Sequence, residues 1–226
     1  MGHRQDSTRP FQRFLDLAAV VAVVAIVGWL PVPSLARVPV ALVVIGAGLV
    51  LAGPRQGGLG LGQPASWRRA LASGAALGSL LLAAIVVAVI PLLRLAGIPS
   101  PDLSVFDPLV GDPAVLALHL TMAWTIAAFG EEIVFRGFLL QRIESLIPGA
   151  GPGGTITGVG ISAVLFGLAH GYQGGSGMVI AGLAGLLFGS IFVRNGRCLW
   201  PLILAHGLMD SISFIVIFAG AGDWLG

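Results

Sequence analysis

Two adjacent carboxylates, Glu131 and Glu132, and a nearby arginine, Arg136, lie inside an otherwise apolar stretch of the chain. An ionised side chain at the centre of a bilayer costs about 2.5–3.5 kcal/mol on insertion scales, so such groups face the protein interior and mark functional sites. Glu132 and Arg136 are four residues apart and share a helix face, where they can form an ion pair. Glu131 points about 100° away from Glu132 and is therefore the carboxylate available for chemistry.

Two histidines and an aspartate occur in similarly apolar segments nearer the C-terminus, as His170 and as His206 with Asp210 four residues later. A carboxylate can act as the general base that activates a water molecule, and histidine can polarise that water or stabilise an oxyanion. Glu131, His170 and His206 can also bind a divalent metal such as zinc. The sequence leaves the metal-dependent and metal-free alternatives open.

Two serines, Ser162 and Ser211, are the nearest candidates for a serine nucleophile. Neither stands in a G-x-S-x-G motif, and the contiguous zinc motif H-E-x-x-H is absent as well. We therefore interpret both hydroxyls as helix-packing groups.

The composition predicts an integral membrane protein with all of these groups on spanning helices. Hydrophobic residues make up 56% of the chain and charged residues 10%, against about 25% charged in soluble domains. The long apolar runs predict an all-α polytopic membrane protein with about seven transmembrane helices. The expected spans are Arg13–Leu30, Val38–Ala52, Ala70–Leu93, Ala114–Arg142, Ile156–Gly171, Gly177–Val193 and Leu199–Ala219.

The arginines predict the orientation, because cytoplasmic segments carry an excess of basic residues. With the N-terminus inside and the C-terminus outside, only Arg37 and Arg94 lie in outer segments. The inner segments then contain Arg4, Arg9, Arg13, Arg55, Arg68, Arg69, Arg142, Arg194 and Arg197.

The fourth, fifth and seventh spans place the polar groups at a common depth. With a rise of about 1.5 Å per residue, Glu131 lies about 16 Å from the inner end of its helix, His170 about 20 Å, His206 about 10 Å and Asp210 about 16 Å. The four groups are therefore expected to meet in one buried pocket. His119 lies about 18 Å from Glu131 along the same helix and is assigned to packing or to the outer interface.

The order of these motifs resembles that of the CAAX-protease and bacteriocin-processing family of intramembrane proteases. Its pattern is E-E-x-x-x-R, then F-x-x-x-H, then H-x-x-x-N or H-x-x-x-D on separate helices. The resemblance covers roughly residues 114–219, whereas residues 1–113, three helices and an outer loop, carry no recognisable motif. It implies as catalytic residues Glu131, Glu132, Arg136, His170, His206 and Asp210.

By this resemblance, Glu131 and His170 would activate the attacking water. His206 and Asp210 would stabilise the oxyanion or complete a water or metal site, and the Glu-Arg pair would hold the geometry. Asp210 departs from the eukaryotic prenyl-protease members, which commonly have Asn there. An ionised Asp would repel an oxyanion, so Asp210 must be protonated, bind a metal or orient His206.

The resemblance implies a peptidase that cleaves near the C-terminus of a membrane-associated or lipid-anchored peptide. The net charge of +2, with scattered arginines, does not suggest a nucleic-acid partner. The alternative function is a non-catalytic immunity factor, scaffold or proton-coupled transporter, although no internal repeat supports a transporter. Basic residues that are all Arg, together with short loops, favour a bacterial inner-membrane location, and the oligomeric state stays open.

Overall fold

The computed structural model describes residues 8–29, 34–52, 58–147 and 151–225, and no strand occurs among them. The predicted all-α class is confirmed for this part of the chain. Its α-helices are α1 (Thr8–Trp29), α2 (Ser34–Ala52), α3 (Trp67–Ala84), α4 (Ile90–Leu95), α5 (Pro113–Met122), α6 (Gln141–Leu146), α7 (Pro152–Ala169), α8 (Gly174–Arg194) and α9 (Trp200–Phe218). Shorter helical segments of other types are η1 (Ile85–Val89), η2 (Ser104–Leu109), η3 (Ala123–Glu131), η4 (Ile133–Leu140), η5 (Gly171–Gln173) and η6 (Gly222–Trp224).

Within the described residues, five continuous helices are long and apolar enough to cross a membrane. They are Trp67–Leu95, Pro113–Leu146, Pro152–Ala169, Gly171–Arg194 and Trp200–Phe218. These helices occupy the positions of the third to seventh predicted spans, and the sixth begins earlier than expected. α1 and α2 are helices where the first two spans are expected, so a total of seven crossings stays a prediction. Residues 30–33 and 53–57, between and after those two helices, lie outside the described part.

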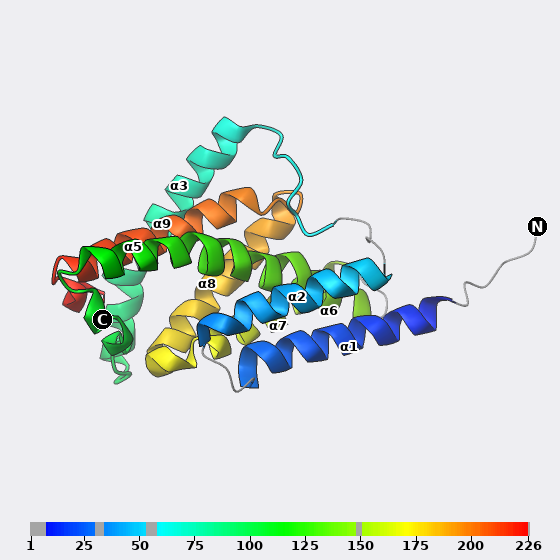
Figure 1. Cartoon of the computed structure of the whole chain (residues 1–226), viewed down its shortest axis with the longest axis horizontal. Coiled ribbons are helices and arrows are strands. Elements are labelled where there is room, and N and C mark those ends of the chain that lie inside the picture. Colours follow the sequence, from blue (N-terminus) through cyan, green and yellow to red (C-terminus); the bar gives the residue numbers. More distant parts are fainter. Residues whose placement is uncertain (1–7, 30–33, 53–57, 148–150, 226) are drawn as a thin grey trace, which may run out of the picture.

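The helix Pro113–Leu146 runs through the middle of the bundle and positions the paired glutamates (Figure 1). Asp112 starts it, because its carboxylate accepts hydrogen bonds from the backbone N–H groups of Ala114 and Val115 at 2.9 and 3.1 Å. α2 and α9 both pack against η3, and α7 packs against η4 and α8. The helices α7 and α9, which are expected to carry catalytic groups, therefore both pack against the helix that carries the paired glutamates.

Part of this central helix is not a regular α-helix. The segments η3 and η4, on either side of Glu132, are π-helical, with hydrogen bonds that span five residues instead of four. The sequence predicted regular α-helical geometry at these positions, and the structure differs. π-helical turns are rare and occur frequently at functional sites.

Small residues allow α3 and α9 to approach closely at the edge of the bundle. A Cβ atom added at Gly74 would lie 2.6 Å from the carbonyl oxygen of Pro201, and one at Gly78 would lie 2.5 Å from that of Ala205. The pair of glycines spaced by four therefore serves helix packing, as the sequence suggests. α3 itself projects from the rest of the bundle (Figure 1).

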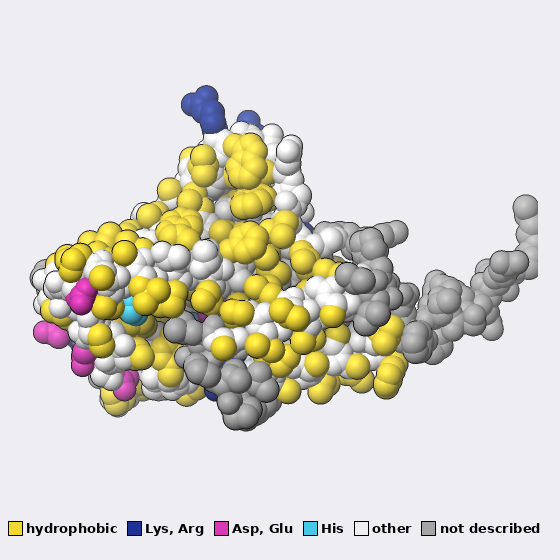
Figure 2. Space-filling model, viewed as in Figure 1, with side chains coloured by type: hydrophobic (Ala, Val, Ile, Leu, Met, Phe, Trp, Pro, Cys, Tyr) yellow, Lys and Arg dark blue, Asp and Glu magenta, His cyan; other side chains and the backbone are white. Residues whose placement is uncertain are grey.

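The outer surface is strongly apolar. Large hydrophobic side chains such as Val87 and Leu95 are 76% and 85% exposed, and hydrophobic atoms cover much of the face in Figure 2. Figure 2 shows acidic side chains at one end of the molecule. Asp107 and Asp112, just before α5, are both exposed. An apolar exterior over helices of spanning length is that of an integral membrane protein.

Candidate active site

The predicted ion pair between Glu132 and Arg136 is present and deeply buried. Arg136 Nη1 donates to Glu132 Oε1 at 2.9 Å, and the two side chains are 1% and 0% exposed. The guanidinium carbon lies 4.3 Å from the ring centroid of Phe166 and 5.5 Å from that of Phe188. Aromatic faces from α7 and α8 therefore hold the cation in addition to the carboxylate.

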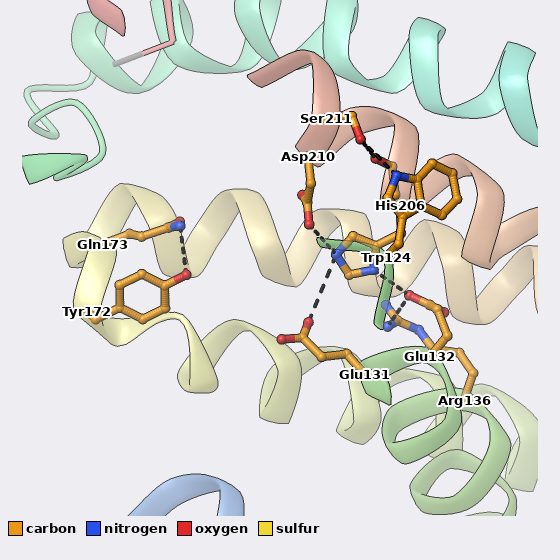
Figure 3. Close-up of polar contacts among 10 residues, drawn as sticks. Trp124, Glu131, Glu132, Arg136, Tyr172, Gln173, His206, Asp210 and Ser211 are labelled. Atoms are coloured by element: carbon orange, nitrogen blue, oxygen red, sulfur yellow. Dashed lines mark hydrogen bonds and ion pairs between the residues drawn. The ribbon is translucent and has the colours of Figure 1, made fainter. Parts of the chain in front are cut away.

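Glu132 also orients the imidazole of His206 on α9. His206 Nδ1 lies 3.0 Å from Glu132 Oε1 and donates to it, because a carboxylate oxygen accepts. The same oxygen thus receives hydrogen bonds from Arg136 and from His206 (Figure 3). Sequence reasoning missed this contact, which joins residues 74 positions apart.

The other nitrogen of His206 faces two further carboxylates. His206 Nε2 lies 4.0 Å from Glu131 Oε2 and 3.7 Å from Asp210 Oδ2 (Figure 3). Within the described part of the chain, Glu131 Oε2 is buried and has no hydrogen-bond partner. A separation of 4.0 Å between two polar atoms is suited to a bridging water molecule.

His170 lies at the C-terminal end of α7, with one ring nitrogen free to accept. Its Nδ1 donates to the carbonyl oxygen of Phe166 at 2.8 Å, so a neutral ring presents Nε2 as an acceptor. The ring stacks on Tyr172 with centroids 5.9 Å apart. Among the described residues, no hydrogen bond or ion pair joins His170 to Glu131. The pairing of these two groups in catalysis stays a prediction.

A single cavity collects the predicted reactive groups. Glu131, His170, His206 and Asp210 all line a cavity of about 490 Å³. The expectation that groups from three separate spans meet in one pocket is therefore confirmed. Glu132 and Arg136 are not part of its wall. Glu132 accepts the hydrogen bond from His206 Nδ1, and Arg136 pairs with Glu132.

The cavity wall also contains side chains that sequence reasoning did not select. Tyr172 and Gln173 line it, and Gln173 Nε2 donates to the Tyr172 hydroxyl at 3.1 Å. Their position directly after His170 is the signal that could have found them. His119 packs between Phe106 and Phe214 as expected, and it lines the same cavity as well.

Residues 113–212 match the family model described as type II CAAX prenyl endopeptidase Rce1-like. This segment contains all three motifs of the predicted site and the helices that carry them. The match supports the resemblance of residues 113–212 to the CAAX-protease family. Comparisons with curated proteins and with solved structures gave no match.

The two candidate serines, Ser162 and Ser211, have packing roles. Ser162 is buried, and its hydroxyl donates to the carbonyl oxygen of Phe135 at 2.8 Å. The Ser211 hydroxyl donates to the carbonyl oxygen of Gly207 at 2.6 Å and accepts from Trp124. These contacts agree with the packing roles expected for both hydroxyls.

Among the described residues, the side chains considered as zinc ligands, Glu131, His170 and His206, do not form a metal site. In the part of the chain that the structure describes, no group of three or more His, Cys, Asp or Glu side chains is arranged to hold a metal ion. Glu131, His170 and His206 line one cavity, yet they do not converge as ligands. The geometry of the described residues therefore does not support a metal-dependent mechanism.

Proposed function

We propose that the protein is an intramembrane endopeptidase that hydrolyses a peptide bond near the C-terminus of a membrane-associated or lipid-anchored peptide. The observation that carries the proposal is the buried Oε2 atom of Glu131, which lies 4.0 Å from His206 Nε2 at a largely apolar cavity. A water molecule between these groups would have a general base on one side and an imidazole on the other. The family match supports the same class of reaction. We place this activity in a bacterial inner membrane.

In the proposed reaction, Glu131 accepts a proton from water as the water oxygen attacks the peptide carbonyl carbon. The C–N bond then breaks, and the proton on Glu131 passes to the leaving amine. His170 presents Nε2 to the same cavity as a second acceptor for the water. Glu131 is regenerated as a carboxylate, and no other reactant is consumed.

His206 is the proposed oxyanion donor. Glu132 holds the Nδ1–H, which aims Nε2 at the cavity. When both ring nitrogens are protonated, Nε2–H can donate to the oxyanion of the tetrahedral intermediate. Asp210, at 3.7 Å from Nε2, would position this ring or donate as a neutral acid.

The test is hydrolysis by the purified protein in lipid vesicles, with a panel of prenylated and unprenylated peptides. Glu131→Gln should lower the rate by about 10²–10⁴-fold, the usual contribution of a general base. Asp107→Asn, at an exposed position on the acidic end, should leave the rate unchanged. Full activity in Glu131→Ala would exclude the catalytic assignment of Glu131, whereas cleavage of no peptide by the wild-type protein would favour a non-catalytic scaffold or immunity factor.

A further inference from the structure

An arginine, Arg37, lines the cavity that contains the reactive groups. It lies in the first turns of α2, next to Val38, which packs against Gly130. A Cβ atom added at Gly130 would lie 2.6 Å from Val38 Cγ1. Arg37 and Glu131 therefore flank one tight helix contact and face the same cavity.

The guanidinium of Arg37 is only partly satisfied by the protein. Nη1 donates to the carbonyl oxygen of Val27 at 3.2 Å, near the end of α1. Nε is buried and has no hydrogen-bond partner, and no carboxylate of the described residues pairs with this side chain. A half-buried cation without a counter-ion, in a largely apolar wall, is costly to maintain.

The unused donors suit a carboxylate. A guanidinium presents its N–H groups as a planar fork, and a carboxylate can accept two of them in parallel. The attraction is stronger in a low-dielectric cavity than in water. Every linear peptide with an unmodified end carries one such carboxylate at its C-terminus.

We infer that Arg37 binds the terminal α-carboxylate of the substrate while Glu131 faces the bond to be cleaved. This inference rests on the proposed function and deepens it. The proposed function already places the cleaved bond near the C-terminus, and the new element is the residue that binds this end, Arg37. An internal peptide bond in a long chain offers no carboxylate to Arg37 and is therefore a poor substrate.

Two peptides that differ only in a C-terminal carboxylate or carboxamide test this inference. We expect the wild-type protein to prefer the acid by about 10- to 100-fold in kcat/KM, the value of a hydrogen bond to a charged group. In Arg37→Gln the ratio should fall close to one, and Arg37→Lys should retain part of it. Because each ratio is measured within one variant, partial misfolding cancels.

The matched control is Arg94→Gln, at an exposed arginine whose Nε donates to Ser100. Arg94 does not line the cavity, so this variant should keep the wild-type ratio. Equal cleavage of acid and amide by the wild-type protein, or an unchanged ratio in Arg37→Gln, would overturn the inference. The same holds if Arg37→Gln alters only the dependence on anionic lipid, since the ligand would then be a lipid phosphate.

A binding assay separates this inference from the proposed function. The Glu131→Gln variant should bind a fluorescent acid peptide more tightly than its amide, and the additional Arg37→Gln change should remove the difference. If the wild-type protein cleaves neither peptide but the binding difference is present, the proposed hydrolysis fails and the Arg37 site stands. If binding shows no difference, the Arg37 site is wrong.

Discussion

At the residue scale, the central feature is one carboxylate oxygen that accepts from two cationic or polar donors. Glu132 Oε1 accepts from Arg136 at 2.9 Å and from His206 at 3.0 Å. Of these three, Glu132 and Arg136 are fully buried and His206 nearly so. Removal of one partner of a buried pair leaves the other charge uncompensated, which is more costly than absence of the whole pair.

Arg136→Met should therefore destabilise the protein strongly. Loss of the guanidinium leaves the Glu132 carboxylate with one donor, and we expect a loss of about 3–5 kcal/mol. The measurement is thermal or denaturant unfolding in detergent. Arg68→Met, at an exposed position near the start of α3, is the matched control. Equal stability of the two variants would show that the buried pair contributes nothing.

Asp210→Asn should retain activity within about tenfold of the wild-type rate. An amide can donate a hydrogen bond to an oxyanion or to substrate, as a neutral acid can. Asp210→Leu has a similar size without a polar group and should lose at least 10²-fold, as expected when an oxyanion-site donor is removed. Peptide hydrolysis in vesicles measures both. Should Asn and Leu be equally damaging, the negative charge of Asp210 would itself be required.

The candidate site could be predicted from the sequence as far as residue identity and depth. Charged groups in apolar spans select Glu131 and Arg136, and the rise per residue places the histidines near them. The hydrogen bond between Glu132 and His206 could not be predicted from the sequence, because it depends on the rotation of α9 about its own axis. The sequence also could not show that Nε2 of His170 is the acceptor, because this depends on the hydrogen bond from Nδ1 to a backbone carbonyl oxygen.

At the element scale, the helices could be predicted because long apolar runs have few other stable conformations in a bilayer. The π-helical segments η3 and η4 could not. They depend on packing of this helix against α2, α7 and α9, and no local residue pattern encodes that packing. Two glycines four residues apart in α3 indicate a close helix contact, but the sequence does not identify α9 as the partner.

Gly78→Ala should weaken the contact between α3 and α9. The new Cβ would lie 2.5 Å from the carbonyl oxygen of Ala205, and a backbone atom cannot rotate away. Overpacking of this kind costs about 1–3 kcal/mol. Unfolding in detergent measures the loss. Gly62→Ala is the control, because nothing lies within 4 Å of a Cβ at that position. Equal stability of both variants would contradict the proposed packing role.

At the scale of the whole molecule, the charges predict the orientation. Exposed acidic groups lie at the end where α5 begins, and Arg68 and Arg69 are exposed at the start of α3. The positive-inside rule depends on the arginines and not on the acidic groups. The orientation therefore stays a prediction from the sequence, and the number of crossings depends on whether α1 and α2 span the bilayer.

Single cysteines in a Cys198→Ser background test the orientation. With the N-terminus inside, Asp107→Cys should react with a membrane-impermeant thiol reagent in intact cells. Arg68→Cys should react only after the membrane is permeabilised. Both positions are exposed, so accessibility does not bias the comparison. The reverse labelling pattern would contradict the predicted topology.

The contact between Glu132 and His206 has a consequence for biosynthesis. The two residues are 74 positions apart, so the glutamate enters the membrane well before the imidazole has been translated. A nascent chain that has inserted only its earlier helices lacks the oriented ring and is inert. We therefore expect the proposed hydrolytic activity only after α9 has emerged from the ribosome and packed against the central helix.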